Sequence, residues 1–296
     1  MAACLGMIMR SEQEMLALIT DTAKDDERIR AVILNGSRAN PNAKRDAFQD
    51  YDVVYIVTDP SSFKKDPDWI KRFGDLMILQ MPDEMHDPPP GDGEQFAYLM
   101  QFMDGNRIDL TIYPIAKLDE LERDSLSLLL LDKDGTIGPI APPSEKDYLP
   151  RPPTAKAFSN CCNEFWWVSP YIAKGLWREE ITYAKYYADR VREQLMKMLL
   201  WHIGINTRFA RNLGKQGKYF REYLEPELWD LLQRTYSDVA YDHTWDALFA
   251  MCNLFRRVAL SVAKHFNFAY PLGDDQRVSA YLEYIRTLPK NAREMD

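Results

Sequence analysis

A proline-rich segment divides this chain into two halves with different sequence patterns. Six prolines fall between residues 139 and 153, at positions 139, 142, 143, 150, 152 and 153. Proline lacks an amide hydrogen and restricts the residue before it, so neither a helix nor a central strand can run through this segment. The chain of 296 residues also exceeds the size at which a single core is usual. We therefore expect two domains, residues 1–141 and 155–296, joined by a junction over residues 142–154.

The first half alternates between helical and strand-like patterns. Ser11, followed three residues later by Glu14, is typical of a helix start and predicts a helix over residues 11–30. Runs of apolar and β-branched residues predict strands at residues 31–34, 51–57, 74–80, 95–103 and 107–113. Further helical turns are expected after Ser37 and near residues 66–73. Asp104-Gly105-Asn106 predicts a hairpin between the last two strands, which makes this half a mixed sheet with flanking helices.

The second half carries helical periodicity throughout. One apolar stripe at helical spacing consists of Cys161, Phe165, Val168, Ile172 and Leu176. A second stripe consists of Val191, Leu195, Met198, Leu199 and His202, where the histidine is expected to be a core residue rather than a catalyst. Helices are also expected over residues 226–236, 241–267 and 275–288. The predicted fold class is therefore α+β, with an N-terminal mixed sheet followed by an all-helical C-terminal bundle.

Composition indicates a folded protein without a membrane partner. Hydrophobic residues make up 46% of the chain, and there are 7 Trp, 16 Tyr and 13 Phe. No apolar run is long enough to cross a bilayer, and residues 1–10 lack the layout of a secretory signal, so we expect a cytoplasmic location. The four cysteines lack disulfide or zinc spacing and are expected to be ordinary thiols, at positions 4, 161, 162 and 252.

The net charge of −8 is spread unevenly between the halves. Residues 1–141 contain 15 Lys and Arg against 26 Asp and Glu, whereas residues 142–296 contain 22 against 19. An acidic domain attracts divalent cations and polycationic small molecules, while a mildly basic one can supply side chains to a triphosphate. Nucleic acid is not an expected partner, because binding its backbone requires a dense basic track. The acidic loop over residues 83–94 is expected at the surface, where it either edges a substrate cleft or is simply solvated.

Three carboxylates carry the strongest chemical signal. Asp50 and Asp52 open the apolar run of residues 53–57, and side chains two apart on a strand share one face. If the strand over residues 107–113 is a neighbour, Asp109 can join them. Such a cluster beside the Gly36-Ser37 turn suits divalent cations that hold nucleotide phosphates, which predicts nucleotidyl transfer. The alternative for each carboxylate alone is a solvated strand edge or a turn cap.

The pattern of Gly36-Ser37-Arg38, Asp50-x-Asp52 and Asp109 resembles the polymerase-β-like nucleotidyltransferase superfamily. Segments of the second half resemble one branch of it, the streptomycin-modifying aminoglycoside 6-adenylyltransferases. These segments are Arg151-Pro152-Pro153-Thr154, residues 161–166 (CCNEFW), Lys174-Gly175-Leu176, Trp201-His202 and Gly214-Lys215-x-x-Lys218. The resemblance covers about residues 9–285, and its second-half segments are the specific part.

The resemblance implies a reaction in which ATP and streptomycin give the 6-O-adenylylated drug and pyrophosphate. Asp50 and Asp52 would then bridge Mg²⁺ ions, and Asp109 would complete the metal site and could take the proton of the acceptor hydroxyl. Ser37 and the backbone amides around Gly36 would hold the β- and γ-phosphates. Arg38 has two interpretations, a cofactor-binding residue or a salt bridge within the domain.

The second half offers further candidates for binding. Lys215 and Lys218 lie three apart, on one helical face if a helix begins at residues 212–214, and could reach the triphosphate; a solvated lysine pair is the alternative. Glu164 shares a helical face with Trp167 and Tyr171, and this carboxylate beside aromatic planes could receive the guanidinium groups of streptomycin. Glu164 could equally be a surface acid.

Other functions are also compatible with the sequence. The acceptor could be a different aminoglycoside or a lincosamide, and the chain could be a nucleotide-binding, antitoxin-like module without turnover. Proteins of the latter kind tend to be single domains. The intact carboxylate set and the full helical half therefore argue against an antitoxin-like module. The sequence does not indicate an oligomeric state.

Overall fold

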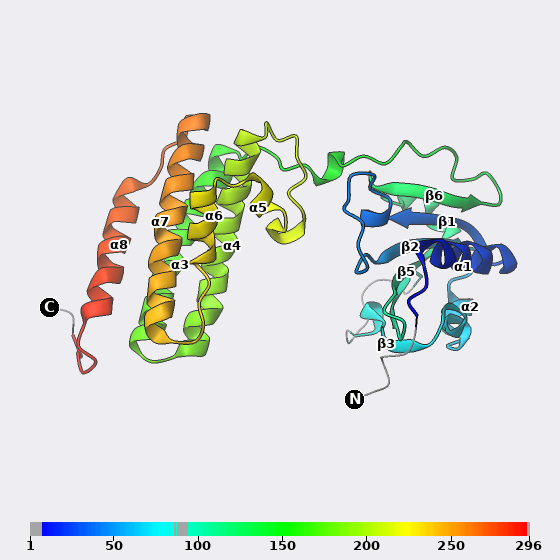
Figure 1. Cartoon of the computed structure of the whole chain (residues 1–296), viewed down its shortest axis with the longest axis horizontal. Helices are drawn as coiled ribbons and strands as arrows, with labels where there is room; N and C mark the ends of the chain where they lie inside the picture. The colour runs from blue at the N-terminus through cyan, green and yellow to red at the C-terminus, as the bar shows by residue number, and fades with distance from the viewer. Residues whose placement is uncertain (1–7, 86, 88–93, 295–296) are drawn as a thin grey trace. The chain divides into compact units, whose positions relative to one another are not determined.

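The computed structural model describes residues 8–85, 87 and 94–294. The chain forms two compact units, Met1–Asp147 and Tyr148–Asp296, so the transition between them falls inside the proline-rich junction. Cys4 and most of the Pro-Pro-Pro loop, residues 88–93, lie outside the described residues. Unit 1 contains the sheet and unit 2 contains the long helices (Figure 1).

Unit 1 contains a six-stranded sheet with short helices around it. Its strands are β1 (Ile29–Asn35), β2 (Tyr51–Val57), β3 (Leu76–Gln80), β4 (Phe96–Phe102), β5 (Arg107–Pro114) and β6 (Ser127–Asp132). Its α-helices are α1 (Glu12–Asp25) and α2 (Ser61–Lys64), and its 3₁₀ helices are η1 (Gly36–Arg38), η2 (Trp69–Phe73), η3 (Pro82–Glu84) and η4 (Ile115–Glu120). One more 3₁₀ turn, η5 (Lys146–Tyr148), follows where the two units meet in the sequence.

The strand order places β2 and β5 in the centre of the sheet. The order is β3-β4-β5-β2-β1-β6, and every neighbouring pair is antiparallel except β2 and β5. Antiparallel β4 and β5 are joined by a tight turn at Gly105, whose φ of +88° favours glycine. The parallel pair β2 and β5 needs a longer connection, which α2, η2, β3 and β4 provide.

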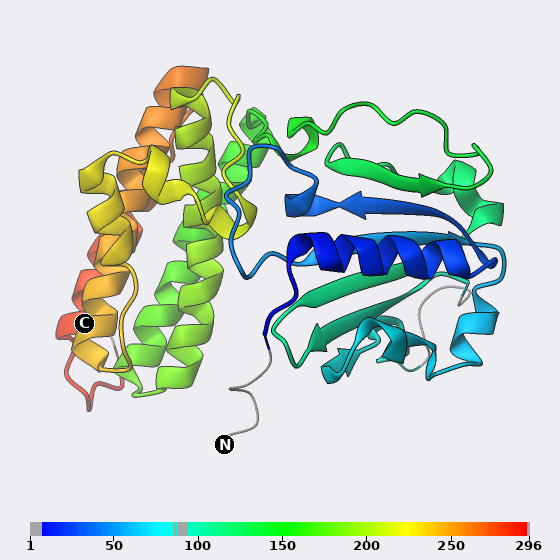
Figure 2. The same cartoon turned by 45° about the vertical axis from the view of Figure 1, so that its right-hand side comes forward.

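Successive side chains of each strand point to opposite sides of the sheet, and both sides are apolar. One face, with Tyr55 of β2 and Leu110 of β5, packs against α1 through Met15 and Ile19. This helix lies along the sheet (Figure 2). The opposite face carries a smaller cluster, which consists of Ala31, Ile33, Val54, Ile56, Tyr113 and Ile137. Asp52 and Asp109 belong to this second face, because Asp52 lies two residues before Val54 of β2 and Asp109 lies four residues before Tyr113 of β5.

The helix predicted over residues 11–30 is shorter than expected. Ser11 is its N-cap and forms the predicted capping box with Glu14, but the helix ends at Asp25. The Asp26 side chain accepts hydrogen bonds from the amide and the guanidinium of Arg28, which turns the chain before β1 begins. The helix expected near residues 66–73 is the 3₁₀ helix η2, and strand β6 was not predicted.

Unit 2 is a helical bundle, as predicted. Its helices are α3 (Ala155–Trp177), α4 (Ile181–Asn206), α5 (Phe220–Tyr223), α6 (Pro226–Gln233), α7 (Tyr241–Phe266) and α8 (Leu272–Thr287), with the 3₁₀ turn η6 (Lys215–Gly217). Helix α3 packs against α4 and α8, and α4 packs against α7. Every member of the two predicted apolar stripes is buried. His202 contacts Glu225 through Nε2 at 3.3 Å, but its buried Nδ1 has no hydrogen-bond partner among the residues that the structure describes.

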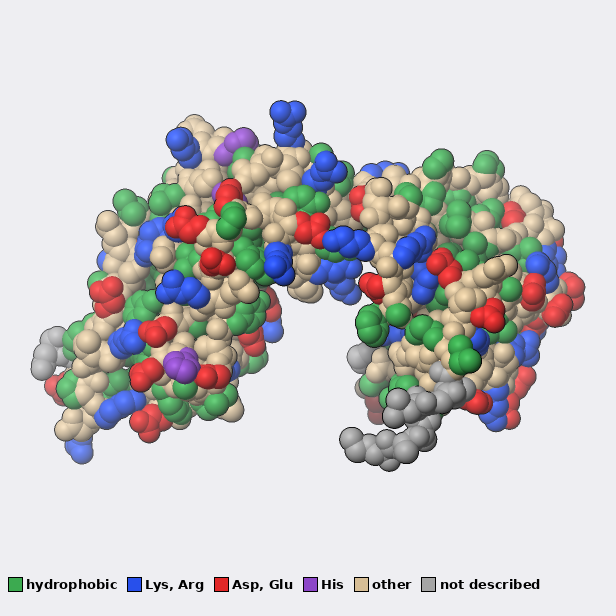
Figure 3. Space-filling view, viewed as in Figure 1, with side chains coloured by type: hydrophobic (Ala, Val, Ile, Leu, Met, Phe, Trp, Pro, Cys, Tyr) green, Lys and Arg blue, Asp and Glu red, His purple; other side chains and the backbone are tan. Residues whose placement is uncertain are grey.

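The helices of the two units differ from membrane-spanning helices in length or polarity. Among the described residues, every helix is too short or too polar to cross a membrane. Acidic and basic side chains are interspersed with apolar ones on the faces of both units that Figure 3 shows.

Candidate active site

The three predicted carboxylates meet at one edge of the sheet. Asp52 of β2 lies directly opposite Asp109 of β5 in the parallel register, and Asp50 immediately precedes β2. The expectation that these strands are neighbours is therefore confirmed. The carboxylates are close enough to perturb one another, since both Asp109 and Asp50 raise the pKa of Asp52.

The surrounding protein compensates the charge of Asp52 only in part, through the charge of Arg107. Burial, followed by the charges of Asp109 and Asp50, raises the pKa of its carboxyl group to about 6. No described residue forms a hydrogen bond or an ion pair with it. Gly36 packs closely over this side chain: a Cβ atom at position 36 would lie 2.3 Å from Oδ2 of Asp52, and its φ is +73°. Glycine is therefore required at this position both by space and by backbone conformation.

Asp109 is already paired with a cation of its own strand. The Arg107 guanidinium donates from Nε to Oδ1 of Asp109 at 2.7 Å and from Nη2 to Oδ2 at 2.8 Å. The same Nε lies 3.8 Å from Oδ2 of Asp50. The hydrogen bonds to Asp109 raise the pKa of Arg107, and burial raises the pKa of Asp50. Arg107 was not singled out from the sequence, although its position two residues before Asp109 puts both on one face of β5.

The chemistry of these residues fits a divalent metal ion. Carboxylate oxygens are the ligands that Mg²⁺ prefers, and the buried charge of Asp52 calls for a neighbouring cation. Within the described ranges, however, no three Asp, Glu, His or Cys side chains are arranged to hold one ion together. Both oxygens of Asp109 are engaged by Arg107. The three aspartates therefore provide carboxylate oxygens for a metal ion, and one of them, Asp109, is bound by Arg107.

The Gly-Ser turn next to the carboxylates forms the short helix η1. The Ser37 hydroxyl makes no hydrogen bond with any described residue, so it is available to a ligand. The Gly36 amide, in contrast, donates to the carbonyl oxygen of Leu126 at 3.0 Å. The prediction that backbone amides around Gly36 hold phosphates therefore does not extend to the amide of Gly36 itself in this conformation.

Arg38 has partners inside unit 1. Its guanidinium lies over the ring of Tyr51, 3.8 Å from the centroid, and donates to the carbonyl oxygen of Gln49 at 2.8 Å. It also lies 3.4 Å from a carboxylate oxygen of Glu12, and only 7% of its side chain is exposed. These contacts favour the second interpretation from the sequence, a salt bridge within the domain.

Lys215 and Lys218 lie in an irregular turn rather than a helix. The residues between α4 and α5 include Gly214, Gln216 and Gly217, all with positive φ. A regular helix cannot contain this conformation, so the expected shared helical face is wrong. Both lysines are exposed, and the Lys218 ammonium lies 5.0 Å from the centroid of the Tyr219 ring. Their role toward a triphosphate stays a prediction.

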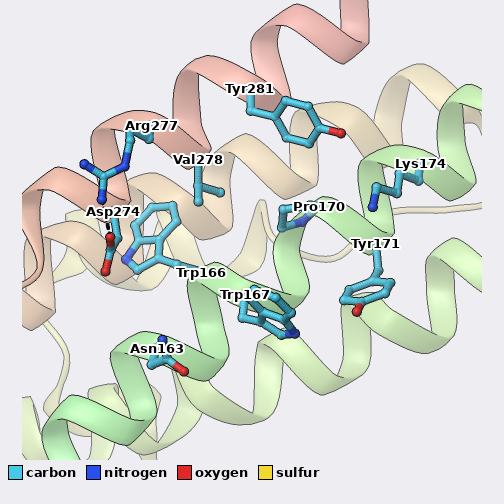
Figure 4. Close-up of a pocket in the computed structure, with 10 residues that line it drawn as sticks. All are labelled: Asn163, Trp166, Trp167, Pro170, Tyr171, Lys174, Asp274, Arg277, Val278 and Tyr281. Carbon is cyan, nitrogen blue, oxygen red and sulfur yellow. Dashed lines mark hydrogen bonds and ion pairs between the residues drawn. The ribbon is translucent and has the colours of Figure 1, made fainter. Parts of the chain in front are cut away.

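The predicted drug-binding face of α3 borders a cavity of about 480 Å³ between α3 and α8 (Figure 4). Trp167 is 66% exposed beside it, and the Tyr171 ring stacks on Tyr187 with centroids 5.0 Å apart. Side chains of α8, including Val278 and Tyr281, face those of α3 across the cavity. Glu164 is exposed on α3 but does not line the cavity.

The charges of this cavity do not match a polycation. Lys174 lies 5.4 Å from the centroid of the Tyr171 ring, and Arg277 forms an ion pair with Asp274, the only carboxylate among the lining residues described. Of the predicted substrate residues, Glu164 alone supplies a negative charge. The α8 residues were missed because nothing in the sequence links them to α3.

The chain is similar over almost its whole length to known proteins. The family model described as "Streptomycin adenylyltransferase" matches residues 9–285. A curated relative from Bacillus subtilis (strain 168), "Aminoglycoside 6-adenylyltransferase", is 41% identical over 94% of this chain and 98% of its own length. A relative of the same name from Campylobacter jejuni is 42% identical over 93% of this chain and 95% of its own length.

A solved structure of an aminoglycoside 6-adenyltransferase from Bacillus subtilis is 37% identical, and the match covers 95% of this chain and 100% of that one with a TM-score of 0.46. The family match and the identities of the relatives confirm the resemblance found in the sequence and the class of enzyme, a nucleotidyltransferase. The chain belongs to the streptomycin adenylyltransferase family.

Proposed function

We propose that this enzyme transfers AMP from Mg-ATP to the 6-hydroxyl of streptomycin and releases pyrophosphate. The observation that carries the proposal is the edge where Asp50, Asp52 and Asp109 lie together beside the Gly36-Ser37 turn. The names of the family and of the relatives support the acceptor.

In this proposal, the residues of unit 1 position the reacting groups. Asp50 and Asp52 hold Mg²⁺, which when bound neutralises phosphate charge and lowers the pKa of the acceptor hydroxyl. The free hydroxyl of Ser37 donates to the β- or γ-phosphate, and Gly36 leaves room for the carboxylate of Asp52. Asp109, the carboxylate on the neighbouring strand, completes the metal site and takes the proton of the acceptor hydroxyl. Phosphoryl transfer needs this positioning and charge neutralisation more than covalent chemistry.

The residues of unit 2 supply binding energy in this proposal. Lys215 and Lys218 contact the triphosphate, which their exposure permits. Glu164 and the exposed ring of Trp167 receive guanidinium groups of the drug, with Tyr171 beside them. The positive charge of Lys174 repels a cation near Tyr171. Glu164 is therefore expected to provide most of the electrostatic attraction for the drug on this face of α3.

Pyrophosphate release with Mg-ATP across a small panel of acceptors tests the proposal. We expect release with streptomycin and little with kanamycin, whose cations are ammonium groups on a different ring system. Release with a lincosamide or with kanamycin, and none with streptomycin, would assign the enzyme to a different acceptor. Absence of release with every acceptor, in a folded protein that still binds ATP, would indicate the non-catalytic alternative.

A further inference from the structure

Arg107 occupies a position between two of the three carboxylates. Its Nε lies 2.7 Å from an oxygen of Asp109 and 3.8 Å from an oxygen of Asp50, while Nη2 engages the second oxygen of Asp109 at 2.8 Å. A guanidinium bound to both oxygens of a carboxylate uses one lone pair of each oxygen and places a positive charge where a metal ion would approach. Binding of a metal ion at Asp109 is therefore disfavoured in this conformation.

The three carboxylates consequently differ in how their charges are balanced. Asp52 has no hydrogen bond or ion pair with any described residue, whereas Asp109 has a bidentate one. Asp50 is intermediate, because its distance of 3.8 Å to Arg107 is beyond a hydrogen bond. A cation that approaches these carboxylates is attracted first by Asp52, which has no ion pair, and by Asp50, whose charge is only partly compensated.

The Arg107 side chain has few partners that hold it in place. It is 40% exposed, and among the described residues its hydrogen bonds and ion pairs are with Asp109 and Asp50 alone. An exposed arginine is readily solvated by water, so the guanidinium can leave Asp109 at little cost. The pair is also local, since residues 107 and 109 lie on the same strand.

We propose that Arg107 is a displaceable counter-ion that weakens metal binding at Asp109, so that the ion held by Asp50 and Asp52 binds first and binding at Asp109 follows release of the guanidinium. This inference rests on the proposed function for the identity of the metal ligands. Arg107 is a positioning residue in this scheme: it holds the Asp109 carboxylate in place before metal binds, and its departure frees both oxygens. Premature binding of a metal ion at Asp109 is thereby suppressed.

Titration with Mn²⁺, followed by the electron paramagnetic resonance signal of the free ion, tests the inference without any turnover. We expect the wild-type protein to show a tighter and a weaker class of Mn²⁺ site. In Arg107→Gln the weaker class should tighten about tenfold, because the competing charge-assisted hydrogen bonds are gone. Arg107→Lys keeps a cation but lacks the planar fork, so its weaker class should lie between the two.

A matched control comes from the same sheet. Arg30 of β1 forms a comparable chelating ion pair with Asp134 and none with the three carboxylates. Arg30→Gln should leave both Mn²⁺ affinities unchanged, and circular dichroism should show all three variants folded. Unchanged or weakened Mn²⁺ binding in both Arg107 variants would overturn the inference.

The result of the Mn²⁺ titration can be distinguished from the result of the test of the proposed function. If the wild-type enzyme adenylylates no streptomycin but Arg107→Gln still tightens Mn²⁺ binding, the counter-ion role stands and only the acceptor is wrong. If streptomycin is adenylylated and Mn²⁺ binding does not respond to Arg107, the counter-ion role is wrong and the proposed function stands.

Discussion

Replacing Asp52 with asparagine should stabilise unit 1 in the absence of metal. Burial and the neighbouring carboxylates raise the pKa of Asp52 from 3.8 to about 6. In the unfolded chain the carboxyl group has its ordinary pKa, so above pH 6 it is charged in both states and only the folded state is destabilised by that charge. A shift of about two pKa units corresponds to about 3 kcal/mol.

The pH dependence of this effect follows from the direction of the shift. Because the folded state has the higher pKa, the destabilisation is absent well below pH 4 and grows as the pH rises from about 4 to 6. The advantage of Asp52→Asn in the free energy of unfolding should therefore fall from about 3 kcal/mol at pH 7.5 to about 1 kcal/mol at pH 4.5. For a unit of this size, an advantage of about 3 kcal/mol corresponds to a rise in Tm of roughly 6–12 °C.

Differential scanning calorimetry in EDTA measures this effect and can resolve separate transitions of the two units. Asp119→Asn is the matched control, since Asp119 is an exposed carboxylate of unit 1 with no hydrogen bond or ion pair among the described residues. It should change Tm little at either pH. Equal stability of Asp52→Asn and the wild type at pH 7.5, or a gain that is the same at both pH values, would refute the reasoning.

Three further predictions concern activity. Asp50→Asn and Asp109→Asn should each lower kcat by on the order of a thousandfold while the protein stays folded, because each removes negative charge at the metal site; near-normal turnover would remove that residue from the site. Lys215→Met and Lys218→Met should each weaken ATP use by roughly 1.5–3 kcal/mol, measured as kcat/KM for ATP, and unaltered ATP kinetics in both would mean that neither contacts the triphosphate. Glu164→Gln should lower kcat/KM for streptomycin by roughly ten- to a hundredfold with ATP binding near normal, and an unchanged value would leave Glu164 a surface acid.

Much of unit 1 was predictable because its signals are local. The capping box at Ser11 and the tight turn at Gly105 each involve a few adjacent residues, and both are present. The strand over residues 51–57 was predicted with its observed bounds, since an uninterrupted apolar run is typical of a central strand. The meeting of Asp52 with Asp109 could be stated only as a condition, because strand order depends on contacts distant in sequence.

The parts that escaped prediction depend on contacts that sequence patterns do not encode. Strand β6 follows a loop and reads as a leucine run without alternation, so its pairing with β1 gave no signal. The turn at Gly214 and Gln216 adopts positive φ, which the lysine spacing does not reveal. The cavity between α3 and α8 brings together residues more than a hundred positions apart, as its lining by Trp167 and Tyr281 illustrates.

Mass spectrometry of streptomycin after incubation with the enzyme and Mg-ATP tests the central claim most directly. The account predicts that the drug gains one adenylate at its 6-hydroxyl and that the product accumulates with pyrophosphate. Asp50→Asn should slow formation of this product by on the order of a thousandfold. Streptomycin recovered unmodified while kanamycin gains an adenylate would contradict the account, even if all three carboxylates proved essential.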